Sequence, residues 1–208
     1  MIEKPRIKIL EDFTFEECFA FEEYNNKKIT KNIESNSKVL LERISFDSCH
    51  FIGIDFTKFE IKEMELLDCI FDNCDLSNIE FSDRGIFRCA FKNCRMSGTM
   101  FSECKLENVE LDSVVGNYIN FYKCELKSIC MKNTNLNEGR FMETTTKNLN
   151  LDNVNFTKCD FIKTVFKGAD FSNSIIEKIT TDFDSLKGIK VSPSQALSLS
   201  ILLGIEVV

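Results

Sequence analysis

A five-residue period runs through this chain from Leu41 to Ile176, and it constrains the fold more than any other feature. Every fifth position counted from Phe46 is large and apolar in 24 of 26 units, and the exceptions are Gly116 and Thr146. This period matches neither the repeat of an α-helix nor that of a β-strand. Self-similarity at a fixed period indicates a repeat architecture, in which each unit buries its apolar face against its neighbours.

The ten cysteines follow the same register. Eight of them stand two residues before a central apolar position, in a column otherwise filled by Val, Ile and Ala: Cys49, Cys69, Cys74, Cys89, Cys94, Cys104, Cys124 and Cys159. Such a column is a small buried site in which a free thiol acts as a small hydrophobe. We therefore expect these cysteines to be buried free thiols. The alternative is that they bind zinc or form disulfides. Cys130 falls on the outer surface and is the expected reactive thiol, and Cys18 lies outside the register.

The residue two positions after each centre is often Asn or Gly, which tolerate left-handed turns. Segments such as Cys74-Asp75-Leu76-Ser77-Asn78 and Ala169-Asp170-Phe171-Ser172-Asn173 resemble the pentapeptide-repeat family closely. The resemblance implies an all-β solenoid, a right-handed quadrilateral β-helix with four of the 26 units in each coil. At the strand spacing of ~4.8 Å, the regular rod is about 31 Å long.

The chain divides into three expected parts. They are an N-terminal cap and polar loop (1–40), the pentapeptide-repeat β-helix (41–190) and a C-terminal helix and strand for dimerisation (191–208). Residues 22–38 are polar and are expected to form a loop before the rod begins. An open solenoid exposes strand edges at both ends, so both ends need caps.

The C-terminal part carries the signals of a short helix. Ser192 is the expected N-cap, Pro193 occupies the first helical position, and Gln195 completes a capping box. Gly204 can end the helix, and residues 205–208 read as a short strand. A helix this short is marginal alone and must dock on another element.

The apolar residues of this helix occupy most of its circumference. They could form a cap within one chain, or a cap whose other side pairs with a second copy. We favour a homodimer, because a two-fold contact is the commonest oligomer. The expected dimer interface consists of Leu197, Leu199, Ile201, Leu202 and Leu203.

The run from Gly188 to Ala196, continuing to Ile205, resembles the C-terminus of quinolone-resistance pentapeptide proteins of the Qnr type, in their Gram-positive, loop-less form. This resemblance implies a homodimer that binds DNA gyrase and/or topoisomerase IV and relieves inhibition by quinolones. The alternative is a generic scaffolding rod that binds an unrelated basic protein.

The formal net charge of −7 argues against nucleic-acid binding through a basic patch. Residues 45–83 alone carry ten acids and two bases, a net charge of −8. The expected partner-binding patch on one side of the rod comprises Glu60, Glu63, Glu65, Asp68, Glu80, Asp83 and Glu103. Duplex DNA carries one charge per ~1.7 Å, so this segment could imitate DNA while the whole rod could not. Plain solubility is the other explanation of the charge.

No stretch reaches the length of an apolar membrane span, and the charged N-terminus lacks a signal peptide's apolar core. We therefore expect a cytoplasmic protein with no membrane partner. The single histidine, His50, is outward-facing, and the sequence contains no nucleophile elbow, phosphate loop or zinc motif. A filled rod leaves no substrate pocket. The expectation is a protein that is not an enzyme and holds no cofactor or metal.

Overall fold

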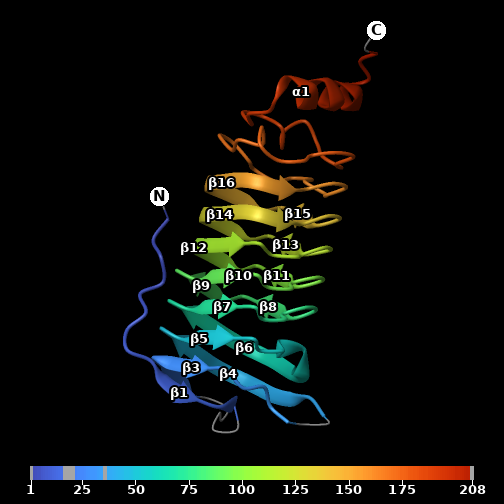
Figure 1. Cartoon of the computed structure of the whole chain (residues 1–208). Coiled ribbons are helices and arrows are strands. Elements are labelled where there is room, and N and C mark those ends of the chain that lie inside the picture. Colours follow the sequence, from blue (N-terminus) through green and yellow to red (C-terminus); the bar gives the residue numbers. More distant parts are fainter. Residues whose placement is uncertain (1, 16–21, 35–36, 207–208) are drawn as a thin grey trace.

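The chain winds into a column of stacked coils, in which each strand lies over its equivalent in the next coil (Figure 1). This computed structural model describes residues 2–15, 22–34 and 37–206. The strand pairs among these residues are parallel, and the strands are joined by tight turns. The expected all-β solenoid is confirmed, with a short helix at its C-terminal end.

The strands form two sheets, a larger one along most of the column and a smaller one confined to its middle coils. The larger sheet contains β1 (Glu11–Phe13), β2 (Glu23–Asn25), β3 (Lys27–Ile29), β4 (Val39–Asp47), β5 (His50–Ile52), β6 (Phe59–Leu67), β7 (Ile70–Asp72), β9 (Gly85–Phe87), β10 (Ala90–Lys92), β12 (Lys105–Asp112), β14 (Glu125–Asn135) and β16 (Thr145–Asn155). The smaller sheet contains β8 (Glu80–Ser82), β11 (Met100–Ser102), β13 (Asn120–Tyr122) and β15 (Arg140–Met142). The helical elements are η2 (Phe56–Lys58), α1 (Pro193–Ser200) and η3 (Ile201–Leu203).

Each regular coil contains twenty residues, as the register shows directly. Phe51 pairs with Phe71, and Phe71 pairs with Phe91. Their rings stack with centroids 4.7 Å apart at both steps. The residues two after these centres, such as Asn73 and Asn93, have φ of 55° and 53°. The left-handed residue turns the chain at every fifth position, so a twenty-residue coil has four sides.

The eight cysteines of the inner column are buried free thiols, as the register predicts. Seven of the eight Sγ atoms donate to carbonyls of the preceding coil, for example from Cys69 to Phe46 O at 3.3 Å, whereas Cys89 donates to Phe87 O of its own coil. Cys130 is half-buried, and burial raises the pKa of its thiol. Its greater reactivity stays a prediction, and Cys18 lies outside the described residues. No cluster of His, Cys, Asp or Glu suited to a metal ion occurs in the described part of the chain.

The expected loop over 22–38 is wrong at its beginning. β2 pairs with β4, and β3 pairs with β5, so the ladder of the solenoid already includes them. Tyr24 lies opposite Phe46, twenty-two residues on, instead of twenty. The spacing between paired residues is therefore two residues longer here than in the regular coils. The five-residue pattern, extended back from Phe46, cannot reveal these strands. The three-part division of the chain stays a prediction.

The C-terminal helix begins as predicted. Ser192 Oγ accepts from Gln195 N at 3.3 Å, and Gln195 Oε1 accepts from Ser192 N at 2.7 Å. The Gln195 side chain also donates to Phe171 O and Ser174 O, which fixes α1 to the last coil. Gly204, with φ of 72°, ends η3. Residues 205–206 are not in a strand, contrary to expectation, and 207–208 lie outside the described residues.

Candidate functional site

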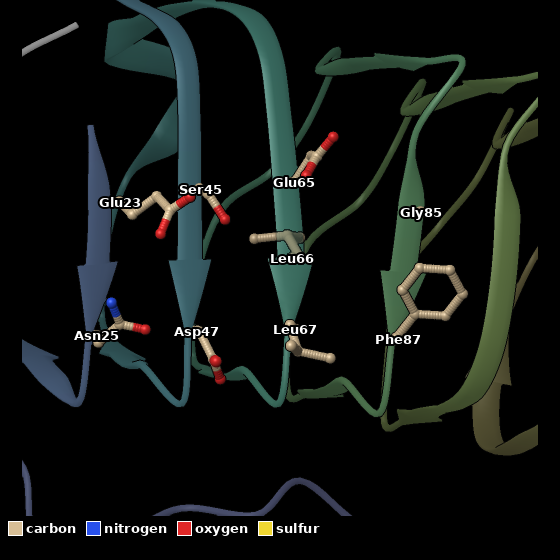
Figure 2. Close-up of a pocket in the computed structure, with 9 residues that line it drawn as sticks. All are labelled: Glu23, Asn25, Ser45, Asp47, Glu65, Leu66, Leu67, Gly85 and Phe87. Carbon is tan, nitrogen blue, oxygen red and sulfur yellow. The ribbon is translucent and has the colours of Figure 1, made fainter. Parts of the chain in front are cut away.

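The outer face of β2, β4, β6 and β9 carries a shallow hollow of about 330 Å³ (Figure 2). A second hollow of about 270 Å³ shares Glu23, Ser45 and Glu65 with the first, so the two are continuous. We call their union the acidic groove. Its outward-facing residues are Glu22, Glu23, Asn25, Arg43, Ser45, Asp47, Glu63, Glu65, Leu67, Arg84, Gly85 and Phe87.

Small residues make the hollow. Glu23, Ser45, Glu65 and Gly85 lie side by side on four neighbouring strands and form one outward row (Figure 2). A Cβ at position 85 would lie 2.1 Å from the Phe87 ring, so that ring lies across the glycine. Phe87 is 36% exposed. The groove thus has an exposed aromatic ring at one end.

Carboxylates dominate the charge of the acidic groove. Five acidic residues and two arginines line it, which leaves a net charge of −3. Arg84 lies 3.2 Å from Glu63 and 3.4 Å from Glu65, and Arg43 lies 3.2 Å from Glu63. The guanidinium of Arg84 therefore reaches the surface, although residue 84 stands in an inward column of the repeat. These exposed pairs are individually weak.

Most of the predicted acidic patch comes together. Glu63, Asp83 and Glu103 recur at the same corner of successive coils, and we call them the acidic ladder. Glu65 lies in the neighbouring groove. Glu60 and Glu80 are both exposed. Each immediately precedes the central apolar residue of its unit, and each lies three residues before a member of the acidic ladder.

Asp68 does not belong to the accessible patch. It is 5% exposed, and it accepts from Arg88 Nε and Nη2 at 2.7 Å each and from Arg6 N at 2.9 Å. Burial by itself raises the pKa of Asp68, but the bonds from Arg88 and Arg6 outweigh it and lower the pKa below its ordinary value. The twenty-residue spacing of Asp68 and Arg88 is the sequence signal that could have found this pair.

Four arginines outside the segment 45–83 reduce its charge. The pairs are Arg43–Glu63, Arg84–Glu65, Arg88–Asp68 and Arg95–Asp75. They bring the net charge of −8 to −4. Two coils of rod, ~10 Å, correspond to about six phosphates of duplex DNA. The first coils therefore fall short of the charge density that the sequence suggested.

The residues expected at a dimer interface are mostly at the surface. Leu197, Ile201 and Leu202 are exposed, with Ile201 at 67%. Leu199 packs against the core, and the side chain of Leu203 lies outside the described part of the chain. An apolar hollow of about 360 Å³ lies between this helix and the last coil. No described helix is both long enough and apolar enough to cross a membrane.

Comparison with known families agrees with the repeat. The model "Pentapeptide repeat region" matches residues 64–141, and the model "Pentapeptide repeats (8 copies)" matches residues 147–177. Together they cover more than half of the chain. The chain belongs to the pentapeptide-repeat family. No curated protein sequence matches this pentapeptide-repeat protein significantly.

Solved structures with a similar backbone include two members with different roles. Full-length QnrB1, described as a plasmid-mediated fluoroquinolone resistance protein, is 18% identical, with a TM-score of 0.44, covering 94% of this chain and 95% of its own. HetL from Nostoc sp. strain PCC 7120, a pentapeptide repeat protein involved in heterocyst differentiation regulation, is 11% identical, with a TM-score of 0.32, covering 90% and 89%.

Proposed function

We propose that this chain binds type II topoisomerases, DNA gyrase and/or topoisomerase IV, and protects them from quinolones without itself catalysing a reaction. The acidic groove and the acidic ladder contact a basic surface of the enzyme, and the protein acts in the cytoplasm as a homodimer. Partial imitation of DNA is confined to the first coils in this proposal.

One observation carries the proposal: the carboxylates gather around a hollow that also holds an exposed aromatic ring. Complementary charge steers two proteins together, and an aromatic residue in a hollow supplies the apolar contact typical of interfaces. The choice of topoisomerase rests on the resemblance of the C-terminal run to Qnr-type proteins. QnrB1, whose description names fluoroquinolone resistance, is consistent with that choice.

We expect added protein to restore gyrase supercoiling in the presence of a fluoroquinolone. The variant Glu65→Gln, Asp83→Asn, Glu103→Gln should need about tenfold more protein for half-maximal rescue, because three rim charges at ~0.5 kcal/mol each sum to about one decade of affinity. The measurement is the fraction of supercoiled plasmid against protein concentration.

The matched control neutralises three acids of later coils, Glu125→Gln, Asp152→Asn and Glu177→Gln, and should rescue like the natural chain. Failure of the natural chain to rescue at several-fold excess over gyrase contradicts the proposal. The alternative, a scaffolding rod for an unrelated basic protein, predicts that a pull-down from cell extract recovers that protein without gyrase subunits.

We expect Ile201→Glu to convert a dimer into a monomer of 24.0 kDa, measured by light scattering after size exclusion. Ile201 is exposed in the single chain, so a charge there disrupts a partner contact while leaving the coil intact. Val115→Glu is the control, because Val115 is an exposed residue in the middle of the rod. A natural chain that is already monomeric at micromolar concentration contradicts the dimer.

A further inference from the structure

The first residues of the chain form a strap that runs up the outside of the rod. Residues 2–10, which we call the strap, leave β1 and climb beside the stacked coils towards β12 (Figure 1). The strap has no strand pairing. It is joined to the rod by hydrogen bonds from Glu3 N to Asn108 Oδ1 (3.1 Å), from Arg6 N to Asp68 Oδ1 (2.9 Å) and from Ser48 Oγ to Arg6 O (3.4 Å).

The strap lies on a single corner of the solenoid. Ser48, Asp68, Arg88 and Asn108 recur one coil apart, with φ of 55°, 53°, 49° and 58°. Their side chains therefore project from the same edge in a vertical row, which we call the corner track. Two of them, Asp68 and Asn108, offer side-chain oxygens to strap N–H groups, so the corner track recognises an extended backbone.

The corner track borders the acidic groove. Asp47, Leu67 and Phe87, which form one row of the groove, each immediately precede a residue of the corner track. The strap carries Lys4, Arg6 and Lys8 against Glu3, a net charge of +2. A basic segment thus lies along the edge of an acidic hollow, which is the charge complementarity expected of a ligand.

The strap makes few contacts with the rod for a segment of its length. Ile2, Pro5 and Ile7 are half-buried, and Ile9 is 91% exposed. The bonds to the rod come from side chains of the corner track and from no β-ladder. A segment held in this way can leave its site without opening the coils, because no strand of the solenoid depends on it.

We propose that the corner track is a docking site for an extended basic peptide, and that the strap is its exchangeable occupant within the chain. The strap then competes with a partner's basic segment for the edge of the acidic groove. That the partner is a topoisomerase rests on the proposed function, whereas the peptide site itself does not.

The test uses a fluorescent peptide with the sequence of residues 1–10 and the full-length protein. A released-strap variant, K4E with R6E and K8E, should bind this peptide with one-to-one stoichiometry in a fluorescence anisotropy titration. The natural chain should bind it at least about tenfold more weakly, because its tethered strap is present at high effective concentration. The control variant K147E with K167E and K178E carries the same charge change elsewhere and should behave like the natural chain.

Variants of the peptide separate docking from general attraction without altering the protein's fold. Arg6→Pro removes the N–H that Asp68 accepts, and it should weaken binding to the released-strap variant about tenfold or more, the scale of a hydrogen bond to a buried charge. A scrambled peptide of the same composition should bind no better than the Arg6→Pro peptide.

Equal binding of the original and scrambled peptides, or equal binding to the natural and released-strap proteins, overturns the proposal. So does an absence of binding to the released-strap variant whose circular dichroism matches that of the natural chain. Peptide docking together with failed gyrase rescue retains the corner track and refutes only the topoisomerase as the partner.

Discussion

Replacing Phe91 by alanine is expected to lower the free energy of unfolding by about 3–5 kcal/mol. Phe91 is fully buried, and its ring stacks on Phe71 at 4.7 Å with an interplanar angle of 10°. The coils pack a continuous column of side chains, so the neighbours cannot close the space that the ring leaves. Urea unfolding followed by circular dichroism, with the slope of the transition checked, measures the loss.

Phe87→Ala is the matched control for this substitution. Phe87 belongs to the same coil but lies on the outer face, where it is 36% exposed. Removing it should cost less than about 1 kcal/mol, because its ring is partly in water already. Equal losses for the two variants would mean that the inward phenylalanines do not form the core of the rod.

Replacing Asp68 by asparagine is expected to lower the free energy of unfolding at neutral pH by about 2 kcal/mol, since the change removes the charged acceptor of the half-buried Arg88 from a buried position. The carboxylate of Asp68 accepts two bonds from Arg88 and one from Arg6 N. The measurement is again urea unfolding, repeated from pH 7 down to pH 2.

The pH dependence has a definite sign. The pKa of Asp68 is lowered in the folded chain. Its stabilising contribution is therefore present above the unfolded pKa of about 3.9, and it is lost as the pH falls through the lower folded value. The difference between the natural chain and Asp68→Asn should shrink in that acid range. Asp83→Asn, at an exposed position of the acidic ladder, is the control and should be as stable as the natural chain at neutral pH. A stability difference between the natural chain and Asp68→Asn that stays constant in acid contradicts the assignment.

The repeat and the core could be predicted because each depends on neighbouring residues. A large apolar side chain at every fifth position, with a turn residue two places later, defines the local conformation of every unit. The positions of Phe51, Phe71 and Phe91 in one stack follow once a coil has twenty residues. The capping box of Ser192 and Gln195 is equally local, and it was predicted correctly.

The first strands and the acidic site depend on contacts across coils, which the linear sequence shows poorly. β2 and β3 pair with β4 and β5 at a spacing that departs from the regular coil, so their register could not be counted back from Phe46. The charge of residues 45–83 looked unopposed because the arginines that pair with it stand outside that range. Asp68 was expected at the surface, but its carboxylate accepts bonds from Arg88 of the next coil and from Arg6 of the strap.

The sequence by itself determined the solenoid, its inward phenylalanine and cysteine columns, and the start of the terminal helix, because short-range periodicity and turn chemistry control those features. Only the tertiary structure decided which charges neutralise one another, where the outer face is hollow, and where residues 2–10 lie. Those properties depend on side chains that are a coil or more apart in the sequence. The stacking of the coils, and not the local sequence, brings these side chains into contact.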